Sequence, residues 1–490
     1  ALLFVAAMNY ILNSVSSLPI RARSVGVHKC NGASSKDIFN MFLFETAALF
    51  VVALVCMALL LFAFREYVAD MVAVPTLGTL LNAQTIWLPA IMILAIFILS
   101  ALLPARLFSV IPVTQVFRVS TSGKQGWKRS LLFIQFGGIA FVITLLVIVL
   151  LQYDRLMNND LGYDPENIVY APLNNMDDQK AAKLTAEFKK LPYVTATGLS
   201  SMDILSGYGG FPILDNEKNW LFTARQVNYD ADYLSLMKIP LLEGQPLKGD
   251  GDILVNESFV SKRGWTDAAI GKYIYDDEGN LKGKIVGVTR DFMVNSFFTP
   301  QLPVIMFGSD RMSYCNFTVR VSELTPEYLR EMNDKIAELF PNEDVGFTVL
   351  KTIIESQYEG TRHFRDGVFV ASIAILLITL MGLLGYITDE MHRRSKEIAI
   401  RKVNGATAPN ILRLLSKDVL ITAFPAILLG VIASRVVGES WLRQFADKIP
   451  LTVFIFISTA LLVLAIIWGC VILKSWNIAN ENPVRSIKNE

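Results

Sequence analysis

The sequence predicts an α-helical integral membrane protein, with about seven transmembrane helices and one inserted α/β domain outside the cytoplasm. Three observations predict this fold class. Of the 490 residues, 53% are hydrophobic and only 18% are charged, whereas typical soluble domains contain roughly 25% charged residues. The apolar residues gather in runs of about 20, which is the length of helix that crosses a bilayer core of about 30 Å. One long polar stretch, residues 153–366, separates two groups of these runs.

Each apolar run is long enough to span a membrane and carries few charges. A buried helix of a soluble protein is seldom apolar on all faces over such a length, so a soluble fold is disfavoured. The run at 418–436 is the least typical, because it contains a proline, a glycine and an arginine. Because the chain opens inside the first run without the basic region of a signal peptide, we expect its N-terminus to be missing. The predicted spans are residues 1–18, 41–64, 87–108, 131–152, 367–388, 418–436 and 451–473.

Lysine and arginine in the short loops predict the orientation in the membrane. Cytoplasmic loops carry an excess of these residues, and three short connections, around 21–36, 118–129 and 393–402, are rich in them. These connections are therefore predicted to be cytoplasmic, and alternation places residues 153–366 outside. That outer segment holds 32 acidic and 22 basic residues, ten more acidic than basic, spread over its whole length. This distribution is typical of a solvated surface.

The outer segment has the pattern of a folded α/β domain. Residues 167–172 and 284–289 are β-rich, whereas 178–191 and 326–339 have the spacing of amphipathic helices. Glycine and proline punctuate the connections between such runs. With more than 200 residues, the segment is long enough to bury a core of its own.

An internal repeat lies in two of the cytoplasmic connections. Residues 21–34 read RARSVGVHKCNGAS, and residues 394–407 read RSKEIAIRKVNGAT. The two segments align without gaps and share the triplet Asn-Gly-Ala. Each copy follows one apolar run and precedes two more. The chain therefore contains the last part of one helical module and the whole of a second.

The second copy has the features of a short helix at the membrane surface. Glu397 precedes Arg401 by four residues, a favourable pair on a helix, and Gly405 is placed to end that helix. Anchoring of the protein at the membrane by positive charge would be enough to explain the basic residues. It does not explain why Asn-Gly-Ala is repeated, so the repeat favours a role beyond anchoring.

These residues resemble the FtsX-like permease family, also called the MacB-type or type VII ABC transporter permeases. The segment R-S-K-E-I-A-I-R-K-V-N-G-A-T at 394–407 is close to the characteristic stretch between the second and third helices of the family's module. Leu161-Gly162-Tyr163-Asp164, with Ile285-Val286-Gly287-Val288 later in the outer segment, looks like the MacB-type periplasmic core. The resemblance covers essentially the whole chain, and the order of its parts is similar to the two-module permeases of Bacteroidota.

The resemblance implies a division of the chain into five parts. The three-helix end of the first FtsX-like module, a cytoplasmic linker and a transmembrane helix come first. A periplasmic MacB-like core domain and a second three-helix FtsX-like module follow. Their expected ranges are residues 1–108, 109–130, 131–152, 153–366 and 367–490.

The resemblance also implies a coupling surface for a separate ABC-type ATPase. In the family, the matching cytoplasmic segment carries the nucleotide-binding subunit, whose closure moves the periplasmic domain. The first copy departs from the pattern, with Ser24 in place of Glu397 and His28 in place of Arg401, which makes its contact weaker or different. The residues to which the resemblance assigns this role are Arg394, Lys396, Glu397, Arg401, Lys402 and Gly405, together with Arg23, Lys29 and Gly32 of the first copy.

No motif in the sequence indicates catalysis by this chain. A P-loop requires spaced glycines before Lys and Ser or Thr, and the nearest approach, Ser122-Gly123-Lys124, continues with Gln125. The histidines at 28, 363 and 392 have no metal-binding spacing. We therefore expect no directly bound cofactor, no metal and no enzymatic activity. ATP and magnesium would be bound by the partner ATPase.

The sequence thus favours a permease subunit that exports or releases an amphiphile, such as an antimicrobial peptide, a macrolide or a lipoprotein, at the bacterial inner membrane. The alternative is a regulator that transmits motion to a periplasmic cell-wall hydrolase without transport. Expected partners are the ATPase, membrane lipids and a periplasmic adaptor or the substrate, and no nucleic acid. The two-module layout favours transport, because the regulatory branch resembles a single module.

Overall fold

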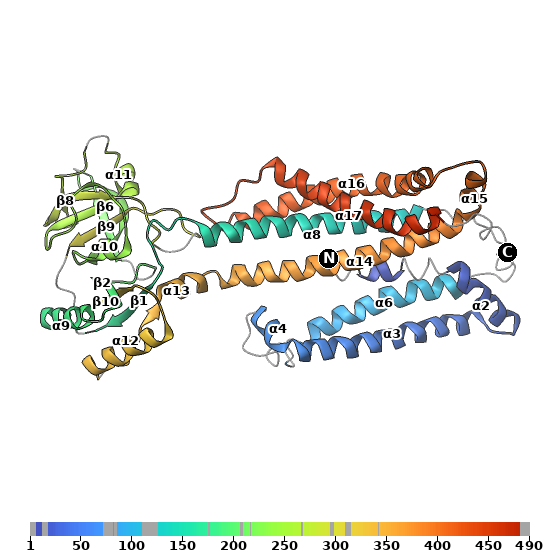
Figure 1. The fold of residues 1–490 in the computed structure, drawn as a ribbon, viewed down its shortest axis with the longest axis horizontal. Coiled ribbons are helices and arrows are strands. Elements are labelled where there is room, and N and C mark those ends of the chain that lie inside the picture. The colour runs from blue at the N-terminus through green and yellow to red at the C-terminus, as the bar shows by residue number, and fades with distance from the viewer. Residues whose placement is uncertain are drawn as a thin grey trace. The chain divides into compact units, whose positions relative to one another are not determined.

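A computed structural model shows a chain made of two compact units (Figure 1). The helical unit comprises Ala1–Tyr153, Gly360–Leu442 and Ile449–Glu490. The α/β unit comprises Asp154–Glu359 and the short segment Arg443–Lys448. The structure describes residues 6–11, 18–71, 82, 86–109, 126–174, 177–205, 209–215, 217–265, 268–294, 298–308, 315–341 and 343–480.

The helical unit consists of long apolar helices and a few short helices between them. Six of the seven predicted spans coincide with described helices, and each of these helices is at least as long as the run that predicted it. The predicted span 1–18 falls largely outside the described residues, as does most of the predicted linker 109–130. After a helical segment at 6–11, the helices are α2 (Leu18–Cys30), α3 (Ser35–Ala63), α4 (Arg65–Met71), α6 (Trp87–Ser109), α8 (Gly126–Asn158), α14 (Glu359–Arg393), α15 (Ser395–Val403), α16 (Ala408–Leu442) and α17 (Val453–Asn480).

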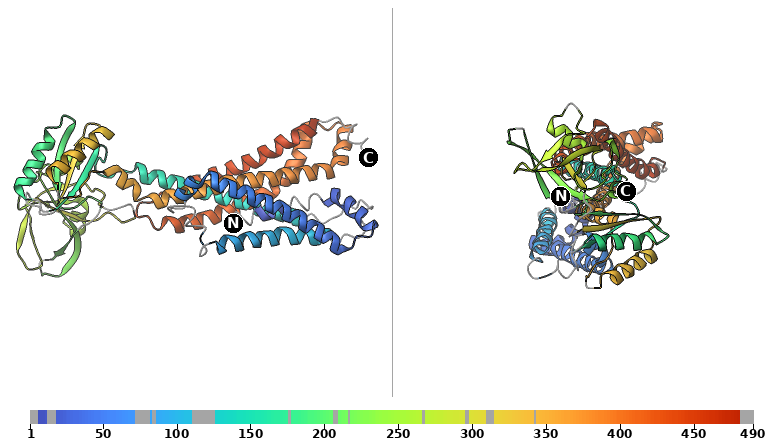
Figure 2. Two further views of the ribbon diagram at one scale, coloured as in Figure 1. Left: turned by 90° about the horizontal axis from the view of Figure 1, so that it is seen from below. Right: turned by 90° about the vertical axis from the view of Figure 1, so that its left-hand side faces the viewer.

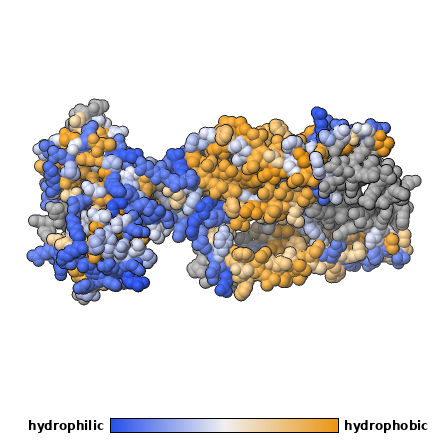
Figure 3. All heavy atoms as spheres, in the orientation of Figure 1, coloured by the Kyte–Doolittle hydropathy of each residue, from blue (hydrophilic) through white to orange (hydrophobic). Residues whose placement is uncertain are grey.

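Five of the described helices are long and apolar enough to cross a membrane, and α6 contributes a shorter apolar stretch, Pro89–Leu102. The run at 418–436, the least typical in the sequence, lies inside the single 35-residue helix α16, which continues through Pro425. Large apolar side chains are exposed along these helices, and the face of the unit seen in Figure 3 is broadly hydrophobic. Together with the length of the apolar helices, such a surface indicates contact with lipid. The chain is therefore a multi-pass membrane protein. Its candidate spans are Ser35–Ala63, Arg129–Asn158, Glu359–Met391, Pro409–Leu442 and Val453–Trp476.

Helix α8 is the most enclosed of these spans. In its most apolar window 56% of the residues are buried, against 6% in α3. Small residues allow α8 and α16 to approach closely, because a Cβ atom added at Gly430 would lie 2.3 Å from the backbone oxygen of Gly137. Further along, the Thr144 hydroxyl donates to the Thr459 hydroxyl of α17 at 3.2 Å. Close contact of small residues is a principal source of stability between membrane helices.

The close contact between α8 and α16 predicts that Gly430→Ala destabilises the protein. The added methyl group meets a backbone atom, which cannot rotate away, so a loss of about 1–3 kcal/mol is expected. Gly469→Ala in α17 is the matched control, since its Cβ meets no atom within 4 Å. Thermal unfolding of the purified protein in detergent compares the two variants. Equal midpoints for both variants would contradict the close packing.

The α/β unit is built on one mixed, 11-stranded sheet. The strand order is β11-β1-β10-β2-β4-β9-β6-β8-β5, with β3 beside β4 and β7 beside β8. The β4–β9 and β6–β8 pairs are parallel, and the other pairs are antiparallel. The strands are β1 (Ile168–Leu173), β2 (Val194–Ser200), β3 (Gly209–Leu214), β4 (Trp220–Tyr229), β5 (Leu241–Gly244), β6 (Asp252–Asn256), β7 (Tyr273–Tyr275), β8 (Leu281–Thr289), β9 (Val304–Gly308), β10 (Cys315–Val321) and β11 (Thr348–Val349).

Five helices accompany this sheet, and two of them were predicted from the sequence. Helices α9 (Asp178–Lys189) and α12 (Pro326–Leu339) confirm the predicted amphipathic segments at 178–191 and 326–339. They lie side by side (Figure 2) and bury Phe188 and Ile336 in one core with β1, β2 and β10. A second core lies beneath β3, β4, β6, β8 and β9. The remaining helices are α10 (Tyr233–Met237), α11 (Glu257–Arg263) and α13 (Leu350–Ser356).

The two halves of the sheet meet at β2 and β4, which share the single residue pair Ser200–Tyr229. Beside this pair, the Asp230 carboxylate accepts hydrogen bonds from the backbone N–H groups of Leu199 and Tyr233, at 2.7 and 2.9 Å. The rings of Tyr229 and Tyr233 stack 4.2 Å apart. Burial raises the pKa of Asp230 to about 6, against the opposing effect of the two backbone donors.

The raised pKa of Asp230 predicts the pH dependence of the α/β unit. An acid whose pKa is higher in the folded state binds more protons there, so its contribution to stability falls as pH rises from about 4 to about 6. Asp230→Asn removes this contribution. The stability of the variant relative to wild type should therefore improve between pH 4 and pH 7. Thermal unfolding across this range provides the measurement. A constant difference would show that the carboxylate keeps its ordinary pKa.

Candidate functional site

The second copy of the sequence repeat forms helix α15, with the features that its residues predict. The Arg401 guanidinium donates to the Glu397 carboxylate at 2.7 Å, and both side chains are about half exposed. The helix ends in a left-handed residue, Gly405, with φ of +86°. The N–H of Ala406 then donates to the carbonyl oxygen of Arg401 at 2.9 Å, which is the six-residue closure of a Schellman motif. The predicted ion pair and helix stop are both confirmed.

The first copy of the repeat ends its helix in the same way. Gly32 has φ of +93°, and the N–H of Ala33 donates to the carbonyl oxygen of His28 at 3.0 Å. The next residue caps the following helix, because Ser34 and Asp37 exchange the hydrogen bonds of a capping box. The two Asn-Gly-Ala triplets thus produce one geometry twice: a short helix, a tight left-handed stop and the start of a membrane helix.

The structure places the predicted surface residues in three environments. Glu397, Arg401, Gly405 and Gly32 are exposed. Lys29 is half-buried, and its ammonium group donates to the carbonyl oxygen of Ser109 at the end of α6, at 2.8 Å. Arg394 is turned inward. Lys396, Lys402 and Arg23 lie on the described backbone of α15 and α2, and their side chains are outside the described part of the structure.

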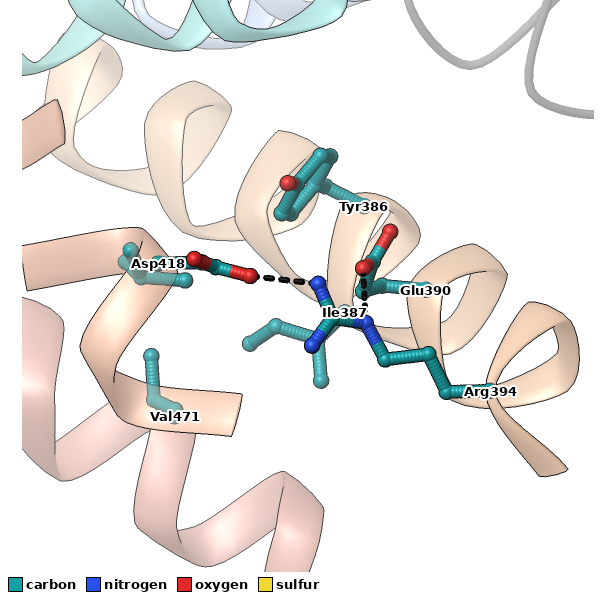
Figure 4. A pocket seen from close by; sticks show the side chains of 7 residues that line it. Tyr386, Ile387, Glu390, Arg394, Asp418 and Val471 are labelled. Carbon is teal, nitrogen blue, oxygen red and sulfur yellow. Dashed lines mark hydrogen bonds and ion pairs between the residues drawn. The ribbon is translucent and has the colours of Figure 1, made fainter. Parts of the chain in front are cut away.

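Arg394 lies between two carboxylates at the junction of α14 and α15 (Figure 4). Its guanidinium donates to Glu390 of α14 and to Asp418 of α16. The exposed fractions of these side chains are 17% for Arg394, 7% for Glu390 and 24% for Asp418. Arg129 of α8 lies 3.7 Å from the same Asp418 carboxylate. Three membrane helices and the start of α15 are therefore joined by one partly buried ion cluster.

The sequence interpretation placed Arg394 on the coupling surface and did not identify Asp418, Glu390 or Arg129. One signal was available, because Glu390 and Arg394 have the i, i+4 spacing of a helical ion pair. The position of Asp418 at the start of an apolar run was a second signal, since an ionisable group there requires a partner. Which partner it finds depends on tertiary packing.

The ion cluster predicts a strong effect of Arg394→Gln. The change removes the guanidinium that pairs with the nearly buried Glu390 carboxylate. We expect a loss of about 2 kcal/mol, which is below the value for a fully buried pair because Asp418 is partly exposed. Adding Glu390→Gln removes the charge that Arg394 neutralises and should restore part of the stability, while Asp418 keeps Arg129. A double-mutant cycle based on thermal unfolding tests this coupling. Additive effects would contradict it.

A group of three or more histidine, cysteine, aspartate or glutamate side chains suited to a metal ion is absent from the described residues. The site consists of the exposed, charged helix α15. Its C-terminal end is terminated by the left-handed turn at Gly405, and its start is bound through Arg394 to three membrane helices. Such an arrangement can receive a protein surface and pass a force on the short helix to α8, α14 and α16.

A duplicated helix–stop–helix element, membrane helices and an inserted α/β domain together define a multi-pass membrane protein built from repeated modules. Two segments of the chain, residues 1–113 and 369–483, match the family described as FtsX-like permease C-terminal. Over these two segments the chain is similar to the FtsX-like permease family, and this similarity supports a permease of the ABC transporter type. The matched segments contain both copies of the repeat.

Three solved structures are similar to part of the chain. The periplasmic region of MacB from Actinobacillus actinomycetemcomitans has 13% identity and a TM-score of 0.30, over 41% of this chain and 97% of that one. A domain of a putative permease protein from Porphyromonas gingivalis has 15% identity and a TM-score of 0.28, over 38% and 90%. The extracellular domain of the noncanonic ABC-type transporter YknZ from Gram-positive bacteria has 10% identity and a TM-score of 0.27, over 37% and 99%. Among curated proteins, none matches the sequence.

Proposed function

We propose that the chain is the membrane subunit of an ABC transporter in the bacterial inner membrane. A separate ATPase would bind ATP and magnesium, dock on α15 and α2, and drive movement of the α/β domain. The movement would export or release an amphiphilic substrate. The observation that carries this proposal is the repeated short helix with its rigid stop, present once in each segment that matches the family.

The exposed face of α15 suits docking by an ATPase subunit. Permeases of this family work with ABC-type ATPases. Glu397 and Arg401 already hold each other in one geometry, so little side-chain freedom is lost when a partner contacts them. The left-handed stop at Gly405 leaves an open surface around its backbone, because a Cβ atom there would meet nothing within 4 Å. A partner could therefore approach the turn closely.

The covalent path from the docking surface to the α/β domain supports the mechanical part of the proposal. Helices α8 and α14 run into the α/β unit, and the α16–α17 connection, Arg443–Lys448, groups with that unit. Within the unit, Arg155 forms a bidentate pair with Asp447, with contacts of 2.6 and 3.0 Å, and Phe445 stacks on Phe298 at 5.1 Å. Movement of any of these helices would act on the domain.

The test combines the purified permease with its candidate ABC ATPase. Changing both Glu397→Ala and Arg401→Ala should weaken the complex by roughly tenfold or more and uncouple ATP hydrolysis from the permease, because two exposed charges of the docking face are lost. The matched control is Glu187→Ala with Lys190→Ala. This pair also forms an ion pair of a helix, at the C-terminal end of α9 in the α/β unit, with a distance of 2.5 Å and exposed fractions of 28% for Glu187 and 67% for Lys190.

Two outcomes would contradict the proposal. Either no ATPase binds the wild-type chain, or the Glu397 and Arg401 changes have no more effect than the control. Stimulation of ATP hydrolysis by amphiphiles would favour transport. A complex that hydrolyses ATP only when a cell-wall hydrolase is present would favour the regulatory alternative.

A further inference from the structure

An open cleft of ≈ 580 Å³ lies between the end of α15 and the first turns of α16. The left-handed turn at Gly405 forms one side of the cleft, together with Arg401. Arg413 and Lys417 of α16 form the other side, and the buried Ile411 contributes an apolar base. The cleft is large enough for a phosphate-containing group of lipid size.

The cleft carries an excess of positive charge. Arg413 and Lys417 are four residues apart on α16, and both are exposed. Neither forms an ion pair with another described side chain. The neighbouring carboxylate, Asp418, is engaged by Arg394 and Arg129 on the inner side of the helix. Arg401 is balanced by Glu397. Two cations that no described side chain neutralises therefore face the cleft, a pattern that favours an anionic ligand.

The position of these cations along α16 matches the headgroup level of a membrane. The apolar part of the helix begins at Val419. With a rise of 1.5 Å per residue, Lys417 lies roughly 3 Å and Arg413 roughly 9 Å before that point along the axis. Basic pockets between membrane helices on the cytoplasmic side are favourable sites for anionic lipid headgroups.

An exposed apolar stripe continues from the cations along the same face of α16. Arg413, Lys417, Ile421, Phe424 and Leu428 are spaced four, four, three and four residues apart, which places them on one side of a helix. Ile421, Phe424 and Leu428 are all more than half exposed. A free phosphate or an acidic peptide would leave this stripe unused, whereas the acyl chains of a phospholipid would cover it.

We propose that the cleft binds the headgroup of an anionic phospholipid, with Arg413 and Lys417 on its phosphate and its acyl chains along Ile421, Phe424 and Leu428. The site is separate from the ion cluster around Arg394. It shares Arg401 and Gly405 with the proposed docking surface, so lipid binding is measured on the permease without the ATPase. Its occupant is identified by two features together, the paired cations and the apolar stripe.

Native mass spectrometry of the full-length protein in detergent tests the proposal. Phosphatidylglycerol, phosphatidylcholine and inorganic phosphate are titrated separately. We expect phosphatidylglycerol to bind roughly tenfold or more tightly than phosphatidylcholine, because only the former carries net negative charge. Lys417→Gln should reduce this preference, and Arg413→Gln with Lys417→Gln should abolish it. The matched control is Lys36→Gln, an exposed lysine in the first turn of the membrane helix α3.

Phe424→Ser separates the two parts of the site. It should weaken binding of long-chain phosphatidylglycerol and leave the protein folded, since the side chain is exposed. Thermal unfolding of each variant checks the fold. Equal binding of the two lipids, an unchanged preference in the double variant, or binding of inorganic phosphate as tight as that of phosphatidylglycerol would each overturn the proposal.

Discussion

The ion cluster around Arg394 is the interaction on which the arrangement of the cytoplasmic end depends. A short amphipathic helix such as α15 has few tertiary contacts of its own, and isolated helices of this length are unstable in water. Arg394 precedes its first residue and is held by carboxylates from α14 and α16, with Arg129 of α8 against the same Asp418. An ion pair in this setting is retained more for specificity than for stability, because desolvation offsets much of its attraction. In this structure the ion cluster around Arg394 determines where α15 begins and how α15 is oriented relative to α14 and α16.

The other end of α15 is fixed by backbone geometry. Gly405 and Gly32 adopt the left-handed conformation that a residue with a Cβ atom resists, and each is followed by the start of a membrane helix. With both ends of α15 constrained, the proposed docking of an ATPase on its exposed face would act on α14 and α16 instead of bending α15. The close backbone contact between α16 and α8 at Gly430 and Gly137 extends this rigid assembly to the helix that leads into the α/β domain.

Local patterns in the sequence account for much of this structure. Apolar runs identified the five described candidate spans and helix α6, the i, i+4 spacing identified the Glu397–Arg401 pair, and Gly405 was identified as the stop of its helix. The inward orientation of the Arg394 side chain was not predictable. Asp418 is 24 residues away in the chain, and Arg129 belongs to α8, which precedes the α/β domain in the sequence, whereas Arg394 follows it. The strand order, with two parallel pairs, and the attachment of Arg443–Lys448 to the α/β unit were also not predictable. They depend on contacts between segments that are distant in the chain.

The central claim is that an ATPase docks on both α2 and α15 and drives movement through these two helices. The direct measurement is the distance between spin labels on Val27 and Val403, two exposed positions on these helices, after replacement of the four native cysteines by serine. Double electron–electron resonance would be recorded on the permease–ATPase complex without nucleotide and with a non-hydrolysable ATP analogue. We predict a distance distribution that shifts when the analogue binds and returns when it is removed. A distribution that is the same in both states would contradict the account.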